Sequence, residues 1–469
     1  MAQELSVNPT EIPGLLILTL PVHGDNRGWF KENWQREKMI ALGLPDFGPV
    51  QNNVSFNEQV GVTRGIHAEP WDKLVSVAHG RVFGAWVDLR AGDTFGTVVT
   101  HEIGPDTAVF VPYGVGNAFQ TLKPSTSYSY LVNDHWSAAA REQYTYLNLA
   151  DETAAIAWPH PLGEAETSEA DRRHPRLAEV VPMPRRRTVI VGSGGQLGMA
   201  LHRAFPEAEI TTRIQVNLAD PVTIDAFDWQ GVGTILNAAA WTAVDEAETP
   251  EGRSVAWAVN ATGVARLAEV ARRRNATFVH VSSDYVFDGS IEEHPEDEAL
   301  SPLGVYGQTK AAGELAAQIA PRHYLVRTSW VVGEGHNFVR TMMSLAEKGV
   351  SPSVIDDQHG RLTFTDDLAG GIRHLVESEA PYGVYNLTSD GPVLTWADIA
   401  ARVFELCGRN PGDVRRVSTQ TYAAGRAMAP RPTHSALRLD KIRRTGMTLS
   451  DGDAQLRDYV TKVLDRRGD

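Results

Sequence analysis

The stretch VIVGSGGQLG, residues 189–198, decides the fold of the second half of the chain. A strand, a glycine-rich turn and the start of a helix follow one another there. Gly192 permits the tight turn, Gly195 lets backbone N–H groups approach a pyrophosphate, and Gly198 allows the helix to pack closely on the strand. A plain flexible turn is also rich in glycine, but a position directly after a strand favours a dinucleotide site.

Strand-like and helix-like runs alternate outward from this stretch. Strands are expected at 188–191, 234–237 and 277–281, with helices near 197–205 and 254–274. This β-α-β order predicts a parallel, doubly wound sheet, the Rossmann architecture.

A further strand is expected to end at 210–213, directly after the first helix, and its end bears on the choice of nicotinamide cofactor. A carboxylate there would bind the ribose hydroxyls of NAD, but the sequence has Arg213, which could pair with a 2′-phosphate. An exposed arginine at a strand end is an equally good explanation. We expect NADPH to serve at least as well as NADH.

A second pattern in this half indicates hydride-transfer chemistry. Tyr306 precedes Lys310 by four residues, which places both on one face of a helix, and Ser283 lies at a strand end. An ammonium beside a phenol favours the phenolate, so Tyr306 could shuttle a proton while Ser283 hydrogen-bonds the same substrate oxygen. The set suits reduction of a ketone. A lone Tyr-x-x-x-Lys is common in helices by chance, so the surrounding motifs carry the interpretation.

Those motifs occur together in one family. They are NAAAWTAVD (237–245), SSDYVFDG (282–289), YGQTK (306–310), RTSW (327–330), DQHG (357–360) and Arg431-Pro432. Over residues 187–468 the chain resembles dTDP-4-dehydrorhamnose reductase, an extended short-chain dehydrogenase. The resemblance implies that Ser283, Tyr306 and Lys310 are catalytic, and that Ser283 and Asp284 contact the substrate. Together with the glycine-rich turn and the strand-end Arg213, it gives the following cofactor-binding set: Gly192, Gly195, Gln196, Leu197, Gly198, Arg213, Ala240, Trp241, Thr242, Tyr306, Lys310 and Trp330.

The first half of the chain has a different pattern, with short apolar runs separated by Gly, Pro, Asn and Asp. Strands are expected at 14–20, 73–77, 82–88 and 108–112. Many short strands with regular turn signals predict an all-β sandwich or barrel. Residues 163–184 are rich in Glu, Arg and Pro, which indicates a tail and linker. The predicted organisation is therefore a barrel domain (1–178), a linker (179–187) and a Rossmann domain with a small C-terminal substrate-binding lobe (188–469).

Charged side chains lie within or beside the strand-like runs of the first half. Inward-pointing charges are costly in a small barrel unless they meet each other or a ligand. Arg27, Arg64, His67 and Lys73 together would suit a phosphorylated substrate.

Two other interpretations of His67 stay open. It could be a hydrogen-bonded core histidine. It could also be a ligand in a metal-binding cupin, but such a site needs further histidines nearby, and His79 and His101 lie in turn-like contexts. No metal ligand is therefore predicted.

Over residues 8–178 the runs RGIH (64–67), KLV (73–75), VDLR (87–90) and YSY (128–130) resemble dTDP-4-dehydrorhamnose 3,5-epimerase. This resemblance implies a cupin-like jelly-roll barrel. It also implies that His67 is the base, Asp171 its hydrogen-bond partner and Tyr130 the proton donor on the opposite sugar face, while Lys73 suits stabilisation of the enolate. The predicted substrate contacts are Arg27, Phe30, Glu32, Gln51, Asn53, Arg64, Asn117 and Trp136. Many family members have His at position 117, so epimerisation at a single carbon stays open.

Composition excludes several other classes of protein. A net charge of −14 argues against non-specific nucleic-acid binding, and we interpret Arg185–Arg187 as a solvated linker. A single cysteine, Cys407, allows no intrachain disulfide and fits a reducing compartment. Residues 1–14 lack the apolar core of a signal peptide, and no apolar run could span a bilayer. A cytoplasmic protein without a membrane partner is expected.

The two resemblances support each other, because the product of the epimerase is the substrate of the reductase. They imply conversion of dTDP-4-dehydro-6-deoxy-D-glucose to dTDP-L-rhamnose, with NADPH or NADH as reductant and a homodimer formed through the barrel. The reductase family is sometimes linked to Mg²⁺, although no carboxylate cluster in the sequence requires it. Two alternatives stay open: another nucleotide-activated deoxysugar as substrate, or a reductase joined to a non-catalytic barrel.

Overall fold

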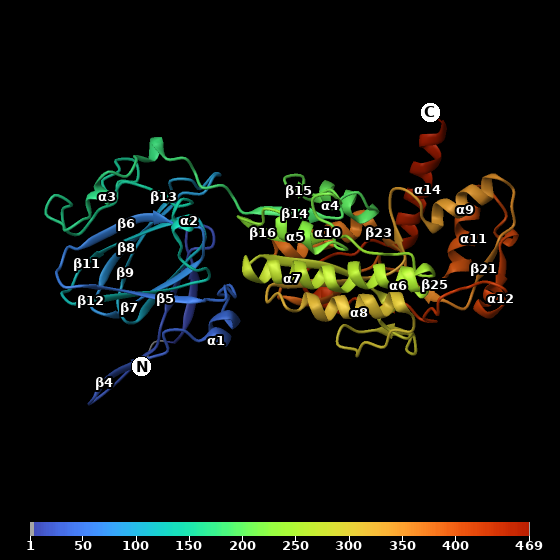
Figure 1. Cartoon of the computed structure of the whole chain (residues 1–469), viewed down its shortest axis with the longest axis horizontal. Coiled ribbons are helices and arrows are strands. Elements are labelled where there is room, and N and C mark those ends of the chain that lie inside the picture. The colour runs from blue at the N-terminus through green and yellow to red at the C-terminus, as the bar shows by residue number, and fades with distance from the viewer. Residues whose placement is uncertain (1–3, 469) are drawn as a thin grey trace. The chain divides into compact units, whose positions relative to one another are not determined.

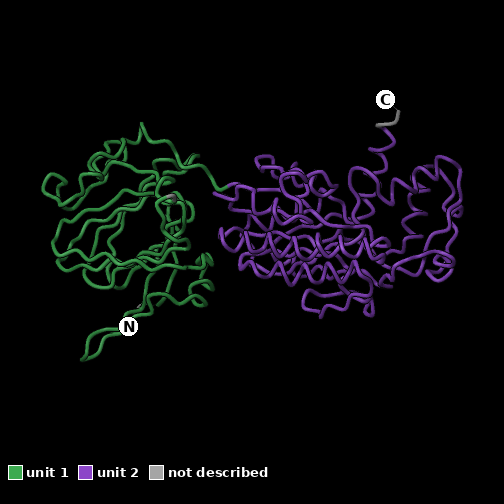
Figure 2. Tube along the Cα trace, in the orientation of Figure 1, with its two compact units in different colours: residues 1–186 green, residues 187–469 purple. Residues whose placement is uncertain are grey.

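The computed structural model describes residues 4–468 and divides into two compact units, residues 1–186 and 187–469 (Figures 1 and 2). Residues 1–3 and 469 of the two expected domains lie outside the described part. Residues 179–187, expected as a linker, include Val180 and Met183, which are buried in the core of the first unit. No helix within residues 4–468 is both long and apolar enough to cross a membrane.

The first unit is built from two antiparallel sheets. One sheet has the order β1 (Ser6–Pro9), β2 (Leu16–Thr19), β10 (Thr107–Val111), β7 (Lys73–His79), β12 (Thr126–Val132), β5 (Gln51–Asn57). The other has the order β13 (Thr145–Tyr146), β6 (Thr63–Ala68), β11 (Val115–Thr121), β8 (Val82–Asp88), β9 (Val98–Ile103). Val75 and Tyr128 of the first sheet pack against Trp86 and Phe119 of the second, so one core joins the sheets. The predicted all-β, cupin-like barrel is confirmed.

Two parts of this unit leave apolar side chains exposed. Strand β5 is the edge of its sheet, and the side chains of Val54 and Phe56 on its outer face are 66% and 56% exposed. The hairpin of β3 (Val22–Asp25) and β4 (Gly28–Lys31) pairs only within itself among the described strands and projects from the unit (Figure 1).

The second unit contains a six-stranded parallel sheet. Its order is β15 (Glu209–Ile210), β14 (Arg187–Val191), β16 (Val232–Asn237), β17 (Thr277–Ser283), β19 (His323–Thr328), β24 (Gly383–Asn386). The chain runs from β14 outward to β15 and then crosses to β16 on the other side of β14. In open α/β sheets, ligands bind outside the carboxyl ends of the strands at such a reversal of strand order.

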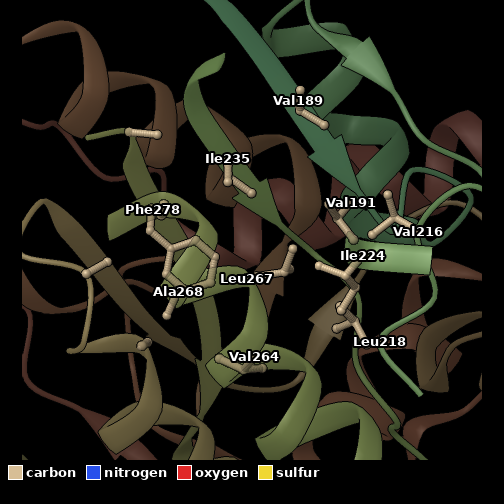
Figure 3. Packing of buried hydrophobic residues seen from close by; sticks show 14 of the residues in the cluster. Val189, Val191, Val216, Leu218, Ile224, Ile235, Val264, Leu267, Ala268 and Phe278 are labelled. Carbon is tan, nitrogen blue, oxygen red and sulfur yellow. The ribbon is translucent and has the colours of Figure 1, made fainter. Parts of the chain in front are cut away.

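Alternate residues along the sheet of the second unit enter two different cores. Val189 and Val191 face the core formed with α5 (Pro221–Ala226) and α7 (Gly263–Arg273), shown in Figure 3. Ile190 faces the opposite core, formed with α4 (Gln196–Ala204) and α10 (Thr365–Glu377). Helices cover both faces of the sheet, which confirms the predicted Rossmann fold.

The second unit also contains a separate smaller core. It is formed mainly by α9 (Phe338–Glu347), α11 (Trp396–Leu406) and α14 (Gly452–Gly468), with the short pair β21 (Ser353–Ile355) and β26 (Arg415–Val417) at its side. This is the lobe that the sequence placed at the C-terminus. The helix expected over 254–274 is interrupted by a π-helical turn at Ala258–Thr262, between α6 (Pro250–Trp257) and α7.

Candidate active sites

A cavity of about 980 Å³ lies in the first unit, and most of the predicted epimerase residues line it. They are Arg64, His67, Lys73, Asn117, Tyr130, Trp136 and Asp171. Gln51 and Asn53 hydrogen-bond each other at 2.8 Å on the strand that contributes Ser55 to the wall, but they are not wall residues themselves.

His67 and Asp171 form the centre of this site. The imidazole Nε2 of His67, on β6, lies 3.0 Å from Oδ1 of Asp171, on the short helix α3 (Glu169–Arg172). The hydroxyl of Ser168 caps that helix by accepting from the Asp171 backbone N–H, which fixes where the carboxylate lies. Burial would raise the pKa of Asp171, but hydrogen bonds from His67 and Ser168 outweigh it and the pKa is lowered. With Nε2 held by a carboxylate, Nδ1 is the nitrogen that can accept a proton.

Two further predicted catalytic residues, Lys73 and Tyr130, also line this cavity. The ammonium of Lys73 is almost fully buried and forms a 3.0 Å ion pair with Glu69, whose carboxylate also accepts from the Trp71 indole at 2.6 Å. Burial, with the nearby Glu69 charge added, raises the pKa of Tyr130 above its usual value. Tyr130 is therefore protonated at neutral pH, as a proton donor must be.

The side-chain carbonyl of Asn117 is already hydrogen-bonded to other protein groups. Its Oδ1 accepts hydrogen bonds from Trp86 Nε1 at 2.9 Å and from the Tyr128 hydroxyl at 3.1 Å. The carbonyl end is thus directed into the barrel core, and only the NH₂ end is left to face the cavity.

Sequence reasoning missed several wall residues of this cavity. They are Glu69, Tyr144, Tyr146 and His174. His174 stacks on Tyr146 with ring centroids 4.6 Å apart, and its Nδ1 lies 3.9 Å from Asp171 Oδ1. Burial lowers the pKa of His174, and the nearby His67 lowers it further. Only its position three residues after Asp171 could have indicated it.

Three predicted substrate contacts lie elsewhere in the chain. Arg27 and Phe30 are on the projecting β3–β4 hairpin and Glu32 follows it, and none of the three lines the cavity of the same chain. Arg27 pairs with Asp25, and Glu32 pairs with Lys38 at 2.7 Å. These three residues therefore do not line the cavity of their own chain, and their contact with the substrate stays a prediction.

The second unit has a cavity of about 500 Å³ at the carboxyl ends of β14, β15 and β16, where the strand order reverses. Five of the predicted cofactor residues line it: Gly192, Gly195, Arg213, Ala240 and Trp241. Gln196, Leu197, Gly198, Thr242, Tyr306, Lys310 and Trp330 are not on its wall. Gln196 instead donates to the His336 carbonyl at 3.1 Å, and Trp330 stacks on Trp396 at 3.8 Å.

The glycines of the first turn fit a bound dinucleotide. Gly192 has φ +84°, and a Cβ there would lie 2.6 Å from the Ala239 nitrogen. A Cβ on Gly198 would lie 2.1 Å from the Gly192 carbonyl oxygen, so only glycine lets α4 approach β14 this closely. Gly195 caps the N-terminus of α4 without a side-chain bond, and a Cβ there would meet only the Gly192 carbonyl oxygen, at 3.5 Å. Backbone N–H groups at this helix end can therefore reach a pyrophosphate.

The predicted catalytic set lies at the ends of β17 and α8 (Val305–Ala317). Ser283 Oγ donates to Asp284 Oδ1 at 2.9 Å and hydrogen-bonds Tyr306. Lys310 is one turn further along α8, and its ammonium donates to the Val281 carbonyl at 2.7 Å. Burial raises the pKa of Asp284 to about 6, against the opposing hydrogen bonds from Ser435 and Ser283.

The ionisation of Tyr306 differs from the expected phenolate. Burial raises the pKa of its hydroxyl to about 12, although the hydrogen bond with Ser283 opposes this. Burial also lowers the pKa of Lys310 to about 8, and its ammonium is directed at a backbone carbonyl. Tyr306 thus carries its proton at neutral pH and can give it to a developing alkoxide.

The two units of the chain match two different protein families. Residues 9–179 match the dTDP-4-dehydrorhamnose 3,5-epimerase family, and residues 186–465 match the RmlD substrate binding domain family. A protein RmlC homolog from Streptococcus pyogenes is 54% identical over 178 residues, which are 37% of this chain and 89% of the relative. The chain belongs to both families.

Relatives of the second unit include a dTDP-4-keto-6-deoxy-D-glucose reductase from Streptomyces niveus. It is 40% identical over 271 residues, covering 56% of this chain and 92% of the relative. A solved dTDP-4-dehydrorhamnose reductase from Bacillus anthracis, in complex with NADP, has a TM-score of 0.54 and 29% identity, covering 59% of this chain and 99% of that one. The family predictions for both halves are confirmed, and we call the units the epimerase unit and the reductase unit.

Proposed function

We propose that this chain epimerises dTDP-4-dehydro-6-deoxy-D-glucose at C3 and C5 and then reduces the C4 ketone with NADPH, giving dTDP-L-rhamnose. One observation carries the proposal. Each unit has its own acid–base set. His67, Asp171 and Tyr130 line the cavity of the epimerase unit, and Ser283, Tyr306 and Lys310 lie at the ends of β17 and α8 in the reductase unit.

In the epimerase unit, a ketone at C4 acidifies the protons on C3 and C5. Nδ1 of His67 takes one of them, and Asp171 stabilises the imidazolium that forms. Negative charge then develops on O4, where the buried ammonium of Lys73 would stabilise it. Tyr130 delivers a proton to the other face of the ring, which inverts the carbon.

In the reductase unit, the glycine-rich turn and Arg213 would hold NADPH, which supplies the hydride when bound. Ser283 would orient the C4 carbonyl by hydrogen bonding to its oxygen. Tyr306 would then protonate that oxygen as it becomes an alkoxide, and Lys310 beneath it would favour the transient phenolate electrostatically.

The test uses the full chain with dTDP-4-dehydro-6-deoxy-D-glucose and NADPH in D₂O, followed by NMR of the product. We expect dTDP-L-rhamnose with deuterium at C3 and C5. Deuterium at one carbon alone would establish a single-position epimerase, and a product of different configuration would establish another deoxysugar pathway. Reduction without any deuterium incorporation would show that the barrel is not catalytic.

We also propose that the chain is a homodimer formed through the epimerase unit. The exposed outer face of β5, with Val54 and Phe56, supplies an apolar contact surface. The projecting hairpin would carry Arg27 and Phe30 into the cavity of the second copy, which would explain why they are absent from their own.

Mixed dimers test this arrangement. A chain with Arg27→Ala and a chain with His67→Ala should each be impaired in deuterium exchange. If the hairpin serves the partner, a mixed dimer regains one intact cavity, so co-expression should restore about a quarter of the normal rate for random pairing. If the hairpin serves its own chain, no mixed dimer has an intact site and the rate stays at the level of the single variants.

We also propose that the enzyme is cytoplasmic, because its single cysteine fits a reducing compartment.

A further inference from the structure

The epimerase cavity brings two histidines and one carboxylate to a single point. One ligand atom from each of His67, Asp171 and His174 lies within 4.8 Å of the others. Asp171 Oδ1 is the common neighbour, at 3.0 Å from His67 Nε2 and 3.9 Å from His174 Nδ1. Among residues 4–468, this is the group of His, Cys, Asp and Glu side chains with the spacing of a metal site.

Two features distinguish this group from a chance cluster. The Nδ1 of His174 is buried and has no hydrogen-bond partner among the described atoms, so this nitrogen is available to bind a ligand. The His174 ring is also fixed, because it stacks on Tyr146 and meets His67 edge-on at 5.5 Å. A buried nitrogen without a partner is costly unless a ligand binds it.

We propose that these three side chains form a site for a borderline transition-metal ion, with Zn²⁺ as the best match. Two imidazoles, one carboxylate and an open fourth position for water are a common ligand set for zinc. Ligand atoms on a tetrahedral zinc lie roughly 3.4 Å apart, from bond lengths of about 2.0–2.1 Å. The two distances to Asp171 Oδ1, 3.0 Å and 3.9 Å, bracket that separation, and the two histidine nitrogens lie within 4.8 Å of each other, so metal binding requires the imidazoles to move closer together.

Metal binding would switch off the base. In the free site the imidazole proton is on Nε2, shared with Asp171, and Nδ1 carries the lone pair. A metal bound to Nε2 takes the lone pair of that nitrogen, so the proton of the neutral ring moves to Nδ1 and no proton is lost. A protonated Nδ1 cannot accept the C3 or C5 proton. The site is therefore inhibitory for epimerisation, an effect that rests on the proposed function, whereas binding itself does not.

Co²⁺ is the probe for binding, because it replaces Zn²⁺ and absorbs visible light when four-coordinate. The full chain should bind one Co²⁺ with a tetrahedral spectrum that one equivalent of Zn²⁺ abolishes. His174→Phe keeps an aromatic ring against Tyr146 but removes Nδ1, and it should weaken binding at least tenfold. His101→Asn, an exposed histidine of the same unit, is the matched control and should change nothing. Equal binding by the wild type and His174→Phe, or no tetrahedral signal in the wild type, would overturn the site.

The functional arm measures deuterium exchange in the same chain. Zn²⁺ should abolish exchange at one equivalent, EDTA should restore it, and NADPH oxidation with pre-epimerised substrate should continue. Asp171→Asn, analysed by Co²⁺ spectra alone, covers the case in which His174→Phe does not fold. Continued exchange in zinc-saturated enzyme would refute the inhibition. Absence of exchange in metal-free enzyme would refute the proposed function instead, while leaving the binding result valid.

Discussion

Asn260 holds both polar groups of the Trp241 backbone. The Trp241 N–H donates to Asn260 Oδ1 at 2.8 Å, and Asn260 Nδ2 donates back to the Trp241 carbonyl at 3.0 Å. The same NH₂ group reaches Thr309 Oγ1 at 3.0 Å, on the helix that carries Tyr306 and Lys310. Asn260 is fully buried within the π-helical turn, and such turns occur often at functional sites. One side chain thus ties the cofactor loop to the catalytic helix.

Asn260→Leu should make both the cofactor loop at Trp241 and the catalytic helix α8 less firmly held. The substitution keeps the volume but leaves the Trp241 N–H and carbonyl without partners, at about 1–3 kcal/mol for each group that stays buried. We expect weaker NADPH binding and a lower unfolding temperature of the reductase unit, measured by fluorescence titration and calorimetry. Gln318→Leu, an exposed amide at the end of α8, is the control. Unchanged NADPH affinity would show that Asn260 supports packing and does not position the loop.

The parts of the site that the sequence predicted are those encoded locally. The turn at Gly192–Gly198 is one continuous segment, and its steric demands are visible in the residues themselves. Tyr306 and Lys310 are likewise fixed by helical spacing.

Residues that tertiary packing brings in could not be found this way. His174 reaches His67 only because the tail folds back along the barrel, and Asn260 points inward only because of the π turn. The sequence also could not show where the β3–β4 hairpin goes, because its apolar residues look the same whether they cover their own cavity or another chain. The raised pKa of Tyr306 could not be predicted from its spacing to Lys310, because it comes from burial of the hydroxyl, which depends on how α8 packs.

Arg213 should decide the preference for NADPH. It is exposed and lines the cofactor cavity next to Thr212, where a 2′-phosphate would lie. A charge-assisted hydrogen bond is worth about 1.5–3 kcal/mol, so its loss corresponds to tenfold or more. Arg213→Asp should therefore lower the ratio of kcat/KM for NADPH to that for NADH by at least tenfold, whereas Arg213→Lys should largely keep it. If both variants retain the wild-type ratio, the 2′-phosphate is bound elsewhere.

Lys310 should make the stability of the reductase unit depend on alkaline pH. Its pKa is about 8 in the folded state and 10.5 when unfolded. Between those values the unfolded chain binds one proton more, so the unfolding free energy rises with pH, by about 3 kcal/mol over the whole interval. Below pH 8 both states are protonated and the contribution is constant.

The comparison uses urea unfolding of the reductase unit between pH 7.5 and 10.5 in the full chain. Lys310→Met should remove this rise, so the difference in unfolding free energy from the wild type should change with pH. Lys462→Met, an exposed lysine on α14, should give a pH-independent difference. If the difference in unfolding free energy between Lys310→Met and the wild type is also independent of pH, Lys310 stays charged within the folded unit.

The two activities should separate cleanly by substitution, because no residue of one acid–base set lies in the other unit. Tyr306→Phe keeps the ring but removes the proton donor for O4, and general acid catalysis contributes about 10²–10⁴-fold. NADPH oxidation should fall by that factor while deuterium exchange continues at the wild-type rate. His67→Ala should abolish exchange yet reduce pre-epimerised substrate normally. Stopped-flow absorbance and NMR exchange on the same preparations measure both rates. If either folded variant loses both activities, the two cavities do not act independently, and the assignment of one reaction to each unit is wrong.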